Sequence, residues 1–116
     1  MNDDEMAVAP DLVLDVRRDG DTAILKLHGD LDIATAPELA ELCQSVHEQG
    51  ARDVVIDLTE TTFLDSAGLR ALIGAQRLFS GDGANVRLSH PSDAVIRLLD
   101  ITGLTGWFAI DCSRST

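Results

Sequence analysis

The chain of 116 residues has no tyrosine, and aromatic residues make up only 3% of it. Its core must therefore be built from aliphatic side chains, and a hydrophobic share of 45% is sufficient for one domain of this length. Basic residues are also scarce, because nine lysines and arginines stand against 20 acidic residues and give a net charge of -11. We expect no nucleic-acid partner, since phosphate backbones are bound by clustered positive charge.

The sequence also has few cysteines and no long apolar run. Cys43 and Cys112 lack the spacing of a metal or redox motif, and Cys43 is expected to be a small core residue. No apolar run approaches the roughly 18 residues that a membrane span needs, and nothing resembles a signal peptide. These absences predict a cytoplasmic protein without direct membrane insertion and without a cofactor.

The motifs of two common enzyme classes are missing. Ser66 lies in the sequence D-S-A-G, but a hydrolase nucleophile elbow needs glycine two positions earlier, where this chain has Leu64. No histidine is placed near Ser66 by the sequence. The stretch Ser80 to Gly83 lacks the lysine and the spacing of a phosphate-binding loop, and is expected to be a helix-to-strand turn. We therefore expect the protein not to be an enzyme.

The pattern of apolar residues predicts the fold. Alternating runs at residues 12–16 and 22–27 flank an Asp-Gly turn, which indicates an antiparallel hairpin. Helical spacing follows up to Gly50, and Thr35 with Glu38 predicts a capping box at the start of that helix. The unbroken apolar run within residues 53–58 predicts a central parallel strand covered on both faces.

The second half of the chain continues the alternation. A helix is expected from Ser66 to about residue 80, with Arg70 and Arg77 on its solvent-exposed face, and a strand is expected at residues 85–89. A last helix opens at Pro91 and Ser92, and a short closing strand is expected at residues 107–110. The fold class is thus α/β, a single domain with a mixed sheet: an N-terminal antiparallel hairpin, then βαβα units, covered by helices. The expected boundaries are a lead-in at residues 1–10, the domain at 11–112 and a tail at 113–116.

Ser66 is the main candidate for a functional residue. It falls where a strand-to-helix connection becomes a helix, beside the carboxylate of Asp65. One of these two side chains could simply cap the helix. Alternatively, Ser66 could accept a phosphate. The start of a helix tolerates this negative charge, but the phosphate would weaken the binding of a partner docked over Asp65. Asp30 and Asp32 could in principle hold a cation, but too few further oxygen ligands are in register, so a surface role is favoured.

Three blocks carry a resemblance to a known family. They are G-D-L-D at residues 29–32 followed by Thr35 and Ala36, V-I-D-L at residues 55–58 leading to F-L-D-S-A-G-L at 63–69, and V-I-R-L-L-D-I-T-G-L at 95–104. On these blocks the chain resembles the anti-sigma factor antagonists, small single-domain proteins of the STAS family. The blocks span nearly all of residues 12–112, and the central block is the specific one.

The resemblance implies a function through protein contact. Family members bind an anti-sigma factor that is also a serine kinase, which releases a sigma factor; the kinase phosphorylates the serine after the aspartate, and a PP2C-type phosphatase reverses this. Carried over, Ser66 is the phosphoacceptor. The resemblance implies partner contacts at Asp30, Asp32, Asp65, Ala67, Gly68 and Arg70. The alternative is an accessory STAS subunit of a transporter or sensory complex.

Overall fold

The computed structural model describes residues 12–61, 63–80, 85–104, 106 and 108–111, which form a mixed sheet with helices. Five strands and three helices alternate along these residues. They are β1 (Leu12–Asp19), β2 (Thr22–Gly29), α2 (Ala36–Glu48), β3 (Asp53–Glu60), α3 (Ser66–Ser80), β4 (Asn85–Ser89), α4 (Asp93–Ile101) and β5 (Ala109–Asp111). The predicted fold class is confirmed.

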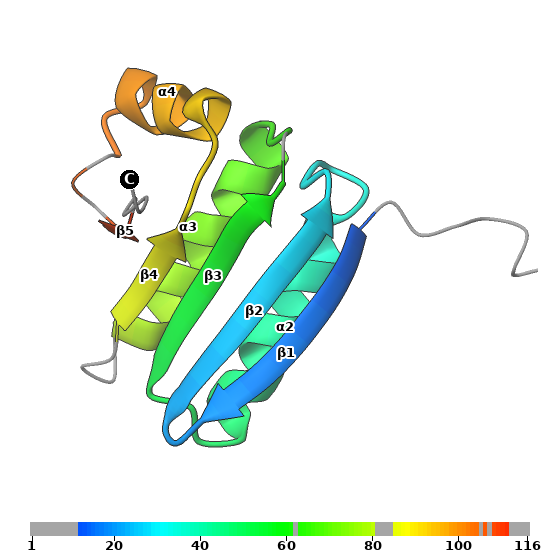
Figure 1. Ribbon diagram of the computed structural model, residues 1–116, viewed down its shortest axis with the longest axis vertical. Coiled ribbons are helices and arrows are strands. Elements are labelled where there is room, and N and C mark those ends of the chain that lie inside the picture. The colour runs from blue at the N-terminus through cyan, green and yellow to red at the C-terminus, as the bar shows by residue number, and fades with distance from the viewer. Residues whose placement is uncertain (1–11, 62, 81–84, 105, 107, 112–116) are drawn as a thin grey trace, which may run out of the picture.

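The strands lie in the sheet in the order in which they occur in the chain, β1 to β5 (Figure 1). β1 and β2 form the predicted antiparallel hairpin, with Asp19 opposite Thr22 and Gly20 in the left-handed region at φ 64°. β2, β3, β4 and β5 are parallel to their neighbours. The carboxyl ends of β2 and β3 therefore meet at one edge of the sheet.

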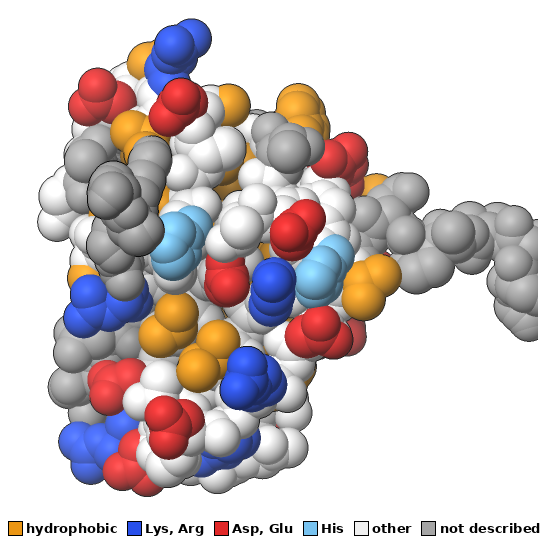
Figure 2. Space-filling view, in the orientation of Figure 1, with side chains coloured by type: hydrophobic (Ala, Val, Ile, Leu, Met, Phe, Trp, Pro, Cys, Tyr) orange, Lys and Arg blue, Asp and Glu red, His pale blue; other side chains and the backbone are white. Residues whose placement is uncertain are grey.

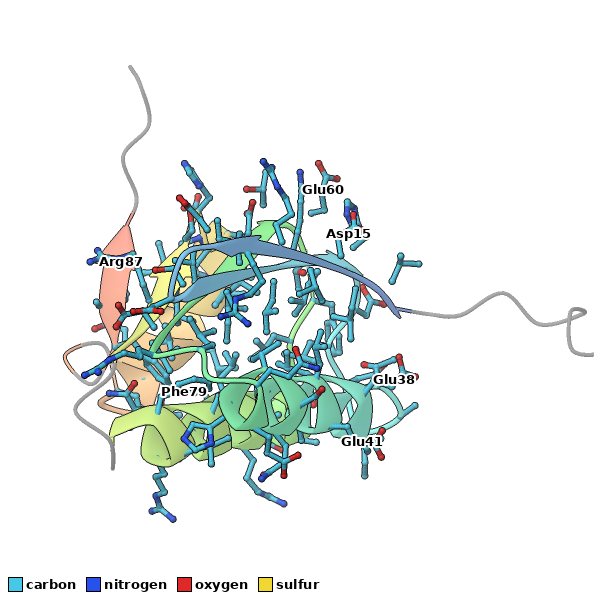
Figure 3. The ribbon with its side chains drawn as sticks, turned by 90° about the horizontal axis from the view of Figure 1, so that it is seen from below. Asp15, Glu38, Glu41, Glu60, Phe79 and Arg87 are labelled. Atoms are coloured by element: carbon cyan, nitrogen blue, oxygen red, sulfur yellow. The ribbon has the colours of Figure 1, made fainter. Side chains whose placement is uncertain are left out.

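The molecule has two layers, because α2 and α3 both cover the same face of the sheet (Figure 3). Phe79 of α3 is fully buried between the layers and belongs to the same core cluster as Leu25, Ile56 and Leu88 of the strands. The prediction that β3 is covered on both faces is wrong. Val55 and Asp57 are only half-buried while their neighbours Val54, Ile56 and Leu58 are fully buried, so β3 alternates like a strand with one solvated face.

The uncovered face of the sheet carries charges of both signs, with some hydrophobic side chains among them (Figure 2). His28 Nε2 lies 3.0 Å from Asp15 Oδ2 there. Burial raises the pKa of Asp57, but hydrogen bonds from the hydroxyl and amide of Thr59, with the nearby charges of Lys26 and His90, more than offset it and hold the pKa below its usual value. The cluster of fully buried side chains lies on the helix-covered face.

The helix ends follow ordinary capping rules. The Ser92 hydroxyl accepts a hydrogen bond from Val95 N at 3.3 Å, and Gly103 follows α4 with φ 76°. Cys43 is buried in the core as predicted, and burial raises the pKa of its thiol to about 12. Among the described residues no helix is both long and apolar enough to cross a membrane. The lead-in at residues 1–10, Trp107, Cys112 and the tail at 113–116 lie outside the described residues.

Candidate functional site

Ser66 lies where two loops meet at the carboxyl ends of β2 and β3 (Figure 1). We call residues 30–35, between β2 and α2, the first loop. Residues 61–65, between β3 and α3, are the second loop. Parallel neighbouring strands bring the two loops together, although α2 and β3 lie between them in the chain.

Backbone hydrogen bonds of Leu31 tie the two loops together. Leu31 N donates to Phe63 O at 3.0 Å, and Asp65 N donates to Leu31 O at 3.2 Å. The two bonds form a short parallel bridge between Leu31 and Leu64 beyond the ends of the strands. The Leu31 side chain is fully buried beneath it. The position of Asp65, and hence of Ser66, is set by the first loop.

Gly68 allows α3 to approach the first loop. A Cβ atom added at Gly68 would lie 2.9 Å from Leu31 Cγ and 3.1 Å from Leu31 C, and closer still to the carbonyl oxygen of Leu31. Any side chain there would push the helix start away from Leu31, whose oxygen already accepts the Asp65 amide. Glycine at this position is required by the close approach of two backbones.

The start of α3 is capped by Asp65 and not by Ser66. Asp65 Oδ1 accepts a hydrogen bond from Gly68 N at 2.9 Å, three residues on, while Asp65 O accepts the first helical bond from Leu69 N. Ser66 is exposed, and no hydrogen bond of its hydroxyl is present within the described residues. The carboxylate of Asp65 is thus the helix cap, and the hydroxyl of Ser66 is available for modification or for contact with a partner.

The first loop is held by a hydrogen-bonded turn. Asp32 Oδ1 accepts hydrogen bonds from Ala34 N at 3.0 Å and from Thr35 N at 3.1 Å. The Thr35 hydroxyl donates to Asp30 O at 2.8 Å and accepts from Asp32 N at 2.9 Å. The predicted capping box is therefore wrong, because the Thr35 hydroxyl faces back into the loop and makes no cap bond with α2.

The second loop is anchored to the sheet through Thr61. Its side chain is fully buried, and its hydroxyl donates to Leu27 O at 3.2 Å across to β2. This bond spans 34 residues, so no local sequence signal reports it. The anchored threonine directly follows β3 and fixes the start of the second loop.

Two large apolar side chains are exposed beside Ser66, one on each loop. Ile33 in the first loop is 77% exposed, and Phe63 in the second loop is 50% exposed. A shallow depression of about 320 Å³ lies between the starts of α2 and α3 and is lined by Ile33, Pro37, Ala67 and Arg70, with three further alanines. Solvent-facing apolar groups of this size are typical of a surface that a partner covers.

The predicted site residues differ in exposure. Asp30, Ser66 and Arg70 are exposed, Asp32, Asp65 and Ala67 are half-buried, and Gly68 is buried. Sequence reasoning singled out neither Ile33 nor Phe63 as functional, although an isoleucine and a phenylalanine flanked by polar loop residues are a readable sign of an exposed contact. The buried Gly68 positions its neighbours through the backbone.

The site has neither a base nor a metal-binding cluster within the described part of the chain. His28 contacts Asp15 and His90 contacts Ser89, both through their rings, and neither histidine is hydrogen-bonded to Ser66. Across the described ranges, no group of three or more histidine, cysteine or acidic side chains is placed to hold a metal ion. What the site offers is an exposed hydroxyl, carboxylates and apolar contact area.

The comparison with known proteins places the chain in a family. Residues 14–112 match the family model described as "Mlab, STAS domain", so the chain belongs to the STAS domain family. A Bacillus subtilis protein named anti-sigma-B factor antagonist is 34% identical over 91 residues, covering 78% of this chain and 83% of that protein.

Solved structures agree with this assignment. An anti-sigma factor antagonist from Mycobacterium paratuberculosis superposes with a TM-score of 0.79 at 27% identity, covering 89% of this chain and 88% of its own. The Bacillus cell fate determinant SpoIIAA in its phosphorylated form has a TM-score of 0.70 at 19% identity, covering 87% of this chain and 93% of its own. The latter similarity concerns the fold alone.

Proposed function

We propose that this chain is an anti-sigma factor antagonist that binds an anti-sigma factor with serine kinase activity and so releases a sigma factor. Phosphorylation of Ser66 by that kinase switches the binding off, and a PP2C-type phosphatase restores it. The protein acts by contact in the cytoplasm and catalyses no reaction itself. The names of the relatives in Bacillus subtilis and Mycobacterium paratuberculosis support the class of function.

The observation that carries the proposal is the division of roles between Asp65 and Ser66. The carboxylate of Asp65 caps α3, and the exposed hydroxyl of Ser66 makes no contact on which the fold depends. A kinase can therefore reach the hydroxyl, and a phosphoryl group can be added without removing a bond from the helix start. An acceptor that also capped the helix would couple modification to unfolding.

The same arrangement explains how a phosphate would act on binding. It adds about -1.5 to -2 charges one residue from Asp65. At a distance of roughly 5 Å and an intermediate dielectric, repulsion between this phosphate and an acidic group of the partner amounts to several kcal/mol, or a hundredfold and more in affinity. The loops held by Leu31 and Thr61 stay in place, so the change is confined to the interface.

The proposed contact surface surrounds Ser66. Ile33 and Phe63 supply its apolar centre, and the carboxylates of Asp30 and Asp32 with the guanidinium of Arg70 supply charged positions at its rim. Interfaces commonly have this arrangement of a few buried apolar anchors within a polar border. Gly68 contributes indirectly by holding Ser66 and Ala67 against the first loop.

The test uses the purified chain, its cognate kinase and ATP. The wild type and Thr59→Ala, which removes an exposed hydroxyl on β3, are expected to take up one phosphate each, and Ser66→Ala none. Equal incorporation into Ser66→Ala would reject the acceptor assignment. Capture from a lysate distinguishes the alternative role, because an accessory transport subunit would recover a transporter ATPase in place of a histidine-kinase-like ATPase.

A further inference from the structure

The exposed residues of α3 form one stripe that starts at Ser66. Ser66, Arg70, Gly74 and Arg77 face solvent, whereas Leu69, Leu72, Ala75 and Phe79 are buried against the sheet. Ser66 and Arg70 are four residues apart in this helix. Side chains at i and i+4 lie one above the other, with Cβ atoms about 5–6 Å apart, and a long arginine readily spans that gap.

Arg70 is available for a new ionic contact. It is exposed, and within the described residues its guanidinium has no ion pair or hydrogen bond. It lines the depression beside Ile33 and Ala67, which places it on the same surface as the Ser66 hydroxyl. The proposed partner-binding surface thus has a cation one helical turn from the proposed phosphate.

The side chains next to Ser66 in the chain do not neutralise an added phosphate. Asp65 is adjacent and carries the same sign of charge. The amide of Gly68, which an anion at the helix start would otherwise use, is already bound to Asp65 Oδ1 at 2.9 Å. Arginine is the side chain best suited to phosphate, because its planar guanidinium donates two parallel hydrogen bonds.

We propose that Arg70 is the intramolecular partner of phosphorylated Ser66, so that modification both adds a phosphate to the contact surface and withdraws the Arg70 cation from it. This rests on the proposed function, in which Ser66 is the acceptor. Partner binding requires Arg70 to leave the phosphate, so pairing and partner binding exclude each other. Because coupling is reciprocal, the pair weakens partner binding by the same factor by which it stabilises the free phosphorylated protein. Arg70 therefore strengthens the switch.

The test places phosphoserine at position 66 during synthesis, so that no kinase or partner is needed. The ³¹P resonance is titrated with pH at low salt in the otherwise unchanged protein, in Arg70→Gln and in Arg70→Lys. Arg97→Gln is the matched control, because Arg97 is also an exposed helical arginine but lies on α4. Repulsion from Asp65 is common to all four proteins and cancels in the comparison.

The expected result is a phosphoserine pKa that is higher in Arg70→Gln than in the parent, by a few tenths of a pH unit. Arg70→Lys should retain part of the effect, Arg97→Gln should match the parent, and 1 M salt should remove most of the difference. Identical titrations for the parent and Arg70→Gln at low salt would overturn the pairing. The titration therefore tests the pairing alone, and a negative result leaves the proposed function unaffected. If the kinase failed to phosphorylate Ser66, the proposed function would be rejected, but the titration of the synthesised phosphoserine protein would be unchanged.

Discussion

Replacing two glycines of α3 by alanine should change the stability of the protein in opposite directions. In Gly68→Ala the new methyl group would lie 2.9 Å from Leu31 Cγ and closer to the Leu31 carbonyl oxygen, which is backbone and cannot rotate away. In Gly74→Ala the methyl group meets nothing within 4 Å, so Gly74 is the matched control. Both replacements gain about 1 kcal/mol of helix propensity.

The net effect at Gly68 is a loss of stability. Overpacking of a closely packed contact costs typically 1–3 kcal/mol. If α3 shifts to relieve it, the bonds from Leu31 N to Phe63 O and from Asp65 N to Leu31 O stretch, at about 0.5–1.5 kcal/mol each. After the propensity gain is subtracted, we expect Gly68→Ala to be destabilised by up to about 2 kcal/mol and Gly74→Ala to be stabilised by up to about 1 kcal/mol.

Thermal and urea unfolding followed by circular dichroism measure this difference. For a domain of this size roughly 4 °C in Tm corresponds to 1 kcal/mol, so Gly68→Ala should melt up to about 8 °C lower and Gly74→Ala up to about 4 °C higher. If both variants were stabilised alike, the close approach of α3 to Leu31 would be refuted, and with it the account of how Ser66 is positioned.

Three further predictions follow from the described contacts. Asp65→Ala should destabilise the fold by about 1 kcal/mol in urea unfolding, because Gly68 N loses its cap, whereas Ser66→Ala should change stability by much less. In a Cys112→Ser background, Cys43 should react with a disulfide reagent only when the protein unfolds. The free energy of unfolding should decrease as the pH rises from the usual thiol pKa of 9.0 to about 12, because in that range the thiol is deprotonated in the unfolded chain and still protonated in the folded one. Thr59→Val should raise the pKa of Asp57 in a proton-carbon NMR titration, and its loss of stability should be present at neutral pH and vanish below the Asp57 pKa, since a lowered pKa stabilises only the ionised form.

The framework of the fold was predictable because its signals are local. The turn at Asp19 and Gly20, the helical spacing around Leu39 and the glycine after α4 each depend on a few neighbouring residues, and the structure follows them. The strand-to-helix position of Ser66 is equally local, so the sequence identified this site before any contact was known.

What sequence reasoning missed depends on contacts between distant segments. Thr35 has the spacing of a capping box with Glu38, but its hydroxyl bonds within the first loop, to Asp30 and Asp32. The bond from Thr61 to Leu27 and the contact of Gly68 with Leu31 join distant segments of the chain, so the spacing of residues in the sequence does not indicate them. The run Val54 to Ile56 reads as apolar on both faces, yet one of its faces is left uncovered by the helices.

In the proposed function, the charge at Ser66 controls binding to the anti-sigma kinase. The most direct measurement is the calorimetric affinity of that kinase for the unmodified chain and for the chain synthesised with phosphoserine at position 66, with both proteins confirmed as folded by circular dichroism. We expect the affinity to be at least about a hundredfold weaker for the phosphorylated chain. Equal affinities for the two folded proteins would contradict it.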